Sequence, residues 1–184
     1  MLSFLPSPLK GILSFLIYLI NTILLTVPLI LVSLLKFILP FRPVVVILDR
    51  ILMGIAGLWI HINSLTTDLF CNIDWDIRGL DKLNPREWYL VLSNHQSWVD
   101  ILVLQKILHT KIPMLKFFLK KELIWVPFLG LAWWALDFPF MKRYSKQFLA
   151  QNPHLKGKDL ESTRKACQKF KHTRRRPIRC LNSV

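Results

Sequence analysis

The sequence predicts an α/β domain with a mixed or largely parallel sheet flanked by helices, joined to an N-terminal transmembrane helix or helical hairpin. Three observations support this fold class. Residues 11–35 carry no charged side chain, residues 88–92 form a short aromatic and apolar run, and residues 101–108 continue with apolar spacing of helix length. A chain of 184 residues has room for one membrane-anchoring helical region, at residues 1–64, and one further domain, at residues 65–184.

The uncharged stretch at residues 11–35 predicts a membrane-spanning helix. At 1.5 Å per residue it would extend ~37 Å, enough to cross a bilayer with some tilt. A cleaved signal peptide is the alternative, but the stretch is too long, only Lys10 precedes it as a charge, and no small-residue cleavage site follows. Pro28 is expected to kink this helix without ending it, since apolar residues continue on both sides.

Residues 44–62 form a second apolar stretch, which carries Asp49 and Arg50. These charges argue against a plain spanning helix. A helix at the membrane interface, or a hairpin partner that dips back into the membrane, is therefore favoured over a second crossing. His61 is interpreted as an interfacial or packed histidine, and we expect a linker near residues 63–67.

Residues 73–78 alternate apolar and charged side chains, which predicts a strand with one solvated face. Asp74 and Asp76 would project from the same face, so a paired-carboxylate or metal site is conceivable there. An exposed polar face is the favoured interpretation. Residues 79–86 are expected to form a loop.

Residues 88–100, WYLVLSNHQSWVD, predict a strand, a turn and the start of a helix. The run at residues 88–92 is short, aromatic and followed by polar residues, which is typical of a buried strand. The helix would cover residues 101–108, and Ser93 or Asn94 could cap it.

His95 and Asp100 are a candidate catalytic pair. Residues five apart in one helix point about 140° away from each other, so the two can meet only if His95 lies in the turn and Asp100 in the first helical turn. In such a pair the neutral imidazole takes a proton from an attacking hydroxyl, and the carboxylate orients the ring. The alternative, which spacing alone favours, is a loop histidine and an aspartate that stabilises the helix N-terminus. A metal site is disfavoured because no third ligand lies at useful spacing.

Residues 116–122, which include Lys121, are interpreted as a strand end or a short amphipathic segment that meets lipid headgroups. Pro127 is expected to open a helix over residues 128–136. A strand over residues 137–141 should follow.

Positive charge dominates the chain, with a net charge of +14, and implies an acidic partner. Lys142 and Arg143 follow the strand predicted at residues 137–141, where positive charge could hold a phosphate. The densest basic cluster is residues 174–176, and anionic lipid is its more natural counter-charge than nucleic acid. An odd number of cysteines at no metal spacing indicates a reduced, cytoplasm-facing domain. These are Cys71, Cys167 and Cys180.

The end of the chain predicts one more helix and one more strand. Asp159 is expected to cap a helix that runs to about residue 172. The last residues, from Pro177, resemble a short final strand.

Four segments carry a resemblance to a known family. They are NHQSWVD at residues 94–100, KEL at 121–123 with the following Pro127 and Gly130, ALDFPFMKRYS at 135–145, and GKDLESTRKACQKFK at 157–171. Together they resemble the glycerolipid acyltransferase superfamily of the lysophosphatidic acid acyltransferase type, whose first motif is His-x4-Asp. The whole string is similar to the YihG-type branch of bacterial acyltransferases.

The resemblance implies transfer of a fatty-acyl group from acyl-CoA or acyl carrier protein to a lysophospholipid such as 1-acylglycerol-3-phosphate, in phospholipid synthesis or remodelling. It implies that His95 is the base and Asp100 its orienter, and that backbone amides near the turn stabilise the oxyanion. It assigns Arg143, with Lys142 beside it, to the acceptor phosphate, and Lys121 to substrate binding at the border of the acyl-binding region. No metal, organic cofactor or nucleic-acid partner is expected.

The expected location is the bacterial inner membrane, with the α/β domain facing the cytoplasm. The family pattern continues with a Glu-Gly-Thr/Ser motif that this sequence does not contain, so we expect a C-terminally truncated domain. The alternative function is that of an inactive truncated membrane protein that only binds anionic lipid.

Overall fold

The computed structural model describes residues 5–94, 96–141, 149, 151, 152, 157, 161, 164, 168 and 178–182. Two units form, Met1–Leu115 with Ile178–Val184 and Lys116–Pro177. The described residues are largely helical, and their strands form two parallel sheets of two strands each. Parallel pairing is therefore confirmed, but the sheets are smaller than an α/β domain predicts.

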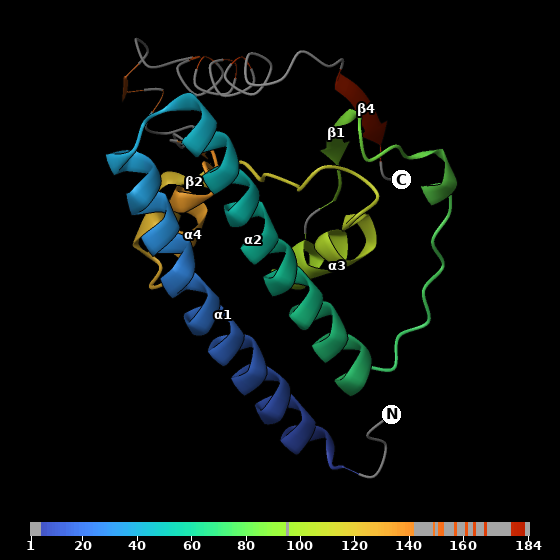
Figure 1. The fold of residues 1–184 in the computed structure, drawn as a ribbon. Helices are drawn as coiled ribbons and strands as arrows, with labels where there is room; N and C mark the ends of the chain where they lie inside the picture. Colours follow the sequence, from blue (N-terminus) through green and yellow to red (C-terminus); the bar gives the residue numbers. More distant parts are fainter. Residues whose placement is uncertain are drawn as a thin grey trace. The chain divides into compact units, whose positions relative to one another are not determined.

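Two long helices dominate the first unit. α1 (Ser7–Ile38) and α2 (Arg42–Phe70) lie side by side as an antiparallel hairpin (Figure 1). Both are long and apolar enough to cross a membrane. Pro28 lies inside α1 without ending it, as expected. The buried side chains of α2 recur every three or four residues and form one stripe: Leu48, Leu52, Ala56, Ile60, Asn63 and Thr66.

Polar side chains join the two helices within this apolar hairpin. Asn21 Nδ2 donates hydrogen bonds to Asn63 Oδ1 at 2.8 Å and to the Trp59 carbonyl oxygen at 3.2 Å. Tyr18 Oη and Thr67 Oγ1 lie 2.9 Å apart. Buried amides and hydroxyls need partners where water is absent, so these bonds favour one register between the helices.

The charges of the second apolar stretch do not interrupt α2. Asp49 forms an ion pair with Lys36 of α1, with 2.7 Å between Oδ1 and Nζ. The partner charge lowers the cost of placing a carboxylate in the hairpin. The expected helical hairpin is thus confirmed, and its placement in a membrane stays a prediction.

The linker predicted at residues 63–67 is wrong, because α2 continues to Phe70. Hydroxyl groups in this segment donate to carbonyl oxygens four residues earlier, which satisfies their polarity inside a helix. The hydroxyls are those of Ser64, Thr66 and Thr67.

The strand predicted over residues 73–78 is also wrong, since this segment has no regular structure. Asp76 instead bonds locally to Arg78, at 2.9 and 3.1 Å, and no sheet of the described residues includes the segment. An alternating pattern becomes a strand only where a neighbouring strand offers its backbone. Asp74 and Asp76 are exposed, which confirms the favoured interpretation of their side chains.

After the short 3₁₀ turn η1 (Leu80–Lys82), the strand predicted at residues 88–92 is found as β1 (Trp88–Leu92). It pairs in parallel with β4 (Ile178–Asn182), the final strand expected from the sequence. Leu90 and Leu92 are exposed, so the prediction that this strand is buried is wrong. A two-stranded ribbon covers little of either face. The predicted helix follows as α3 (Val99–Leu108).

The second unit contains β2 (Leu119–Lys120), the 3₁₀ helix η2 (Lys121–Trp125), α4 (Leu129–Ala135) and β3 (Phe140–Met141). β2 pairs in parallel with β3. The helix predicted over residues 128–136 is confirmed as α4.

The strand predicted over residues 137–141 is shorter than expected because its first residues end α4. Asp137 has φ 57, its N–H donates to the Trp134 carbonyl, and the Phe138 N–H donates to the Trp133 carbonyl. These two bonds form a Schellman motif, with an aspartate in the position that glycine usually takes. Most of the helix predicted over residues 159–172 lies outside the described residues.

Candidate active site

The turn between β1 and α3 holds the candidate catalytic residues. His95 lies outside the described residues, and the turn is described on both sides of it. Asp100 lies in the first turn of α3, as predicted. Its Oδ2 accepts hydrogen bonds from the backbone N–H groups of Gln96 at 2.6 Å and Ser97 at 2.8 Å.

The start of α3 differs from the prediction that Ser93 or Asn94 caps it. The residue before the helix is Trp98, and its side chain makes no capping bond. Ser97 Oγ accepts from the Val99 N–H at 3.0 Å instead. The turn after residue 95 is therefore closed by side chains of the turn itself and of the first helical turn.

This closure fixes the Asp100 carboxylate. Two N–H donors on one carboxylate oxygen hold the group in one orientation, and bonds to an ionised acceptor are stronger than neutral ones. The position at a helix N-terminus favours the negative charge further. A carboxylate held in this way, next to a turn that carries a histidine, is suited to orient an imidazole.

The same bonds restrict the expected oxyanion donors. The N–H groups of Gln96, Ser97 and Val99 already donate within the turn. They are not free to stabilise a developing negative charge, so an oxyanion would need other donors.

The other predicted site residues lie in the second unit or outside the described residues. Lys121 is exposed at the start of η2 and belongs to the second unit, whereas Asp100 belongs to the first. Lys142 and Arg143 lie outside the described residues. Their assignment to the acceptor phosphate stays a prediction.

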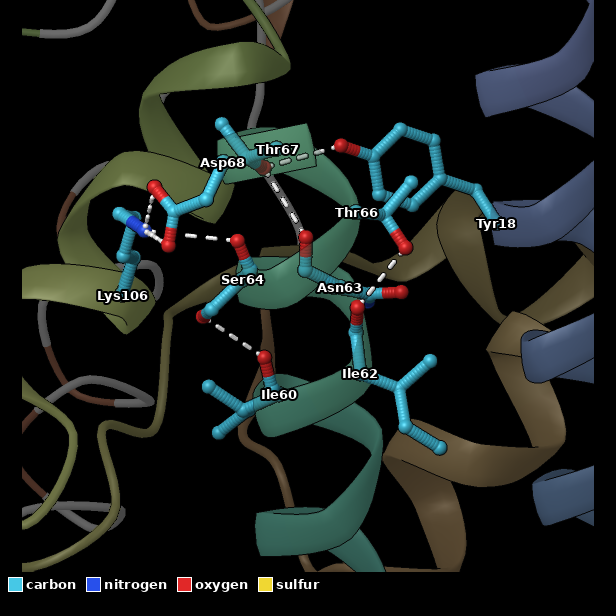
Figure 2. Close-up of polar contacts among 9 residues, drawn as sticks. All are labelled: Tyr18, Ile60, Ile62, Asn63, Ser64, Thr66, Thr67, Asp68 and Lys106. Carbon is cyan, nitrogen blue, oxygen red and sulfur yellow. Dashed lines mark hydrogen bonds and ion pairs between the residues drawn. The ribbon is translucent and has the colours of Figure 1, made fainter. Parts of the chain in front are cut away.

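Lys106 of α3 is a functional candidate that sequence reasoning missed. Its Nζ lies 2.6 Å from both carboxylate oxygens of Asp68 and 3.4 Å from the Ser64 carbonyl oxygen, both on α2 (Figure 2). It also lies 5.7 Å from the ring centroid of Trp75. The available signal was that Lys106 is the single charge in the apolar run of residues 101–108.

His109, directly after α3, lies against the same helix. A Cβ atom at Gly57 of α2 would lie 3.4 Å from His109 Cε1. Burial lowers the pKa of His109 below its ordinary value of 6.5, and the neighbouring His61 lowers it further. At neutral pH a proton on this imidazole is therefore disfavoured.

The described part of the chain contains no group of three or more His, Cys, Asp or Glu side chains that could hold a metal ion. Cys71 is a free, exposed thiol.

Comparison with known proteins places these residues in a wider context. The family model named Acyltransferase matches residues 74–176, more than half of the chain, and this range contains every predicted site residue. Proteins named 1-acyl-sn-glycerol-3-phosphate acyltransferase alpha, from Mus musculus, Homo sapiens and Bos taurus, are each 35% identical over 69 residues. The aligned segment spans 37% of this chain and 23% of the length of these relatives. No solved structure matches the chain.

Proposed function

Since the chain belongs to the acyltransferase family, we propose that it transfers a fatty-acyl group from a thioester donor, acyl-CoA or acyl carrier protein, to the hydroxyl of a lysophospholipid such as 1-acylglycerol-3-phosphate. The names of the three similar proteins support the choice of acceptor. The observation that carries the proposal is the His-x4-Asp spacing in a strand, turn and helix, with the Asp100 carboxylate held by the turn. The YihG-type branch is the proposed subgroup.

In the proposed reaction, His95 takes the proton of the acceptor hydroxyl as its oxygen attacks the thioester carbonyl carbon. The carbon–oxygen bond forms, and the carbonyl electrons move to the oxygen to give a tetrahedral oxyanion. This intermediate collapses, the carbon–sulfur bond breaks, and the imidazolium returns the proton to the leaving thiolate. The products are the acylated acceptor and the free thiol.

Asp100 orients the imidazole and stabilises the imidazolium in this scheme. Because two backbone N–H groups hold its Oδ2, the carboxylate can act on His95 without first being ordered. Arg143, with Lys142 and Lys121, supplies the positive charge proposed to bind the acceptor phosphate.

The proposed setting is the bacterial inner membrane, with the catalytic domain in the cytoplasm. Two apolar helices that end on the same side of a bilayer would leave the basic remainder of the chain next to anionic headgroups. Because α2 continues to Phe70, we propose that the membrane-anchoring region extends to residue 70 and not only to residue 64.

The test is an acyl-transfer assay on the full chain in detergent, with a long-chain acyl-CoA and lysophosphatidate, beside His95→Ala. Product should be measured by mass as the acylated lipid, because the exposed Cys71 thiol would react with thiol reagents. Acceptor-dependent product that His95→Ala abolishes is the expected result. No product above that of the variant, from folded protein and with acyl carrier protein also tried as donor, would overturn the proposal.

A second candidate is a non-catalytic membrane protein that only binds anionic lipid, and the net charge of +14 favours it. It predicts salt-sensitive binding to anionic vesicles that His95→Ala leaves unchanged, with no turnover. Turnover in the acyl-transfer assay excludes it.

A further inference from the structure

The helix α2 has a second face, distinct from the stripe of residues Leu48 to Thr66 that is buried in the hairpin. Gly57, His61, Ser64 and Asp68 are spaced by four, three and four residues, so they lie along one side of the helix. We call these four residues the docking face. Every contact described above between α2 and Lys106 or His109 falls on it.

The first attachment point of α3 is Lys106. Its side chain is 17% exposed, whereas that of Asp68 is 56% exposed, so the ammonium lies under the carboxylate and not in open solvent. The Ser64 carbonyl oxygen faces the same ammonium (Figure 2). The centroid of the Trp75 ring lies 5.7 Å from it. Several acceptors around one cation define its place more narrowly than a single surface ion pair does.

The second attachment point is His109 against Gly57. The distance of 3.4 Å to an added Cβ is ordinary van der Waals contact, so alanine fits there and a larger side chain would displace the ring. Gly54, one turn earlier on α2, offers a matched position, because an added Cβ there meets nothing within 4 Å.

We propose that Lys106 and Gly57 are positioning residues that dock α3 on this face of α2 and so set the distance between the Asp100 turn and the bilayer. The catalytic meaning of that distance rests on the proposed function. With α2 at the membrane interface, the placement that its charges favour, the docking face and Asp68 near the end of the helix lie at the level of the headgroups. Asp100 precedes Lys106 by six positions, ~9 Å along the same helix, so a change in where Lys106 docks moves the Asp100 turn with it.

The first experiment measures depth and needs no activity. In the full chain, the native cysteines are replaced by serine, and Val99→Cys, an exposed position beside Asp100, carries a spin label in vesicles of phosphatidylcholine and phosphatidylglycerol. Its relative accessibility to oxygen and to a water-soluble nickel complex reports depth. Lys106→Met and Gly57→Leu should shift the depth of the label, or broaden its distribution, by several ångströms. Gly54→Leu should leave the depth of the label unchanged.

Two rescue variants separate docking from general destabilisation. Lys106→Arg retains the cation, and the double change Lys106→Asp with Asp68→Lys restores a pair of opposite charges. Both should return the label to its wild-type depth. An unchanged depth in Lys106→Met and Gly57→Leu, or a shift of equal size in Gly54→Leu, overturns the proposal.

The second experiment compares kcat/KM for an acceptor embedded in vesicles with kcat/KM for a short-chain acceptor that stays in water. Lys106→Met should lower the first value roughly ten- to hundredfold, as expected for a displaced reacting group, and leave the second close to wild type. Equal losses for both acceptors would mean a structural role only and would overturn the positioning role. An inactive wild type refutes the proposed function, whereas the depth measurement still decides the docking.

Discussion

Replacement of Asp100 separates its structural role from its proposed catalytic role. Asp100→Asn keeps a side-chain oxygen that can accept the N–H groups of Gln96 and Ser97, but it loses the charge that stabilises an imidazolium. Asp100→Ala loses both.

The magnitudes follow from the two bonds. Asp100→Ala removes both hydrogen bonds to the backbone N–H groups at the exposed N-terminus of a ten-residue helix. This should lower the free energy of unfolding by about 1–2 kcal/mol. Asp100→Asn should lose only part of this, because neutral acceptors form weaker bonds than charged ones. Acyl transfer should nevertheless fall ~10²–10⁴-fold in both variants, the range that a positioned proton-transfer group contributes.

The assay is product formation by mass with lysophosphatidate and acyl-CoA, paired with thermal unfolding of the same preparations. Asp81→Asn, at an exposed aspartate in η1, is the matched control and should change neither value. Wild-type turnover in Asp100→Asn would refute the assigned role. So would a loss of activity that only parallels the loss of stability across the two Asp100 variants.

Three further predictions follow from contacts in the two units. Gly130→Ala should destabilise the second unit by about 1–3 kcal/mol, because its Cβ would overlap the backbone of η2, whereas Gly54→Ala meets no atom. Asn63→Leu should weaken the hairpin by about 0.5–2 kcal/mol, because the buried Asn21 amide loses its shorter hydrogen bond and keeps only the one to the Trp59 carbonyl oxygen. Burial lowers the pKa of His109, so the unfolded chain takes up a proton first, and stability should fall as pH drops below about 6.5.

Thermal or denaturant unfolding in detergent measures each of these effects. Equal free energies of unfolding for Gly130→Ala and Gly54→Ala would contradict the packing described for Gly130. The packing of the hairpin would be contradicted if Asn63→Leu left the association of α1 with α2 unchanged. For the pH effect, His109→Gln is the control. Its unfolding temperature should depend less on pH between about pH 7.5 and about pH 5 than that of the wild type, and parallel curves would exclude His109 as the cause.

Most helices and strands of the described residues could be predicted from the sequence. An apolar run free of charge predicts a helix, and the pattern of residues 88–108 predicts a strand, a turn and a helix. Both predictions succeed because these elements form from the residues next to one another in the chain. The position of Asp100 in the first turn of α3 followed from the same reasoning and is confirmed.

Pairings over long distances were decided by the tertiary structure. In the sequence Asp49 argues against a plain spanning helix, and the structure pairs it with Lys36 of α1. Residues 73–78 alternate, but no strand of the described residues pairs with them. Lys106 meets a carboxylate 38 positions away on α2. Periodicity reports which side of an element is apolar, whereas the partner of a buried charge depends on which elements pack together, and packing joins residues that no local pattern links.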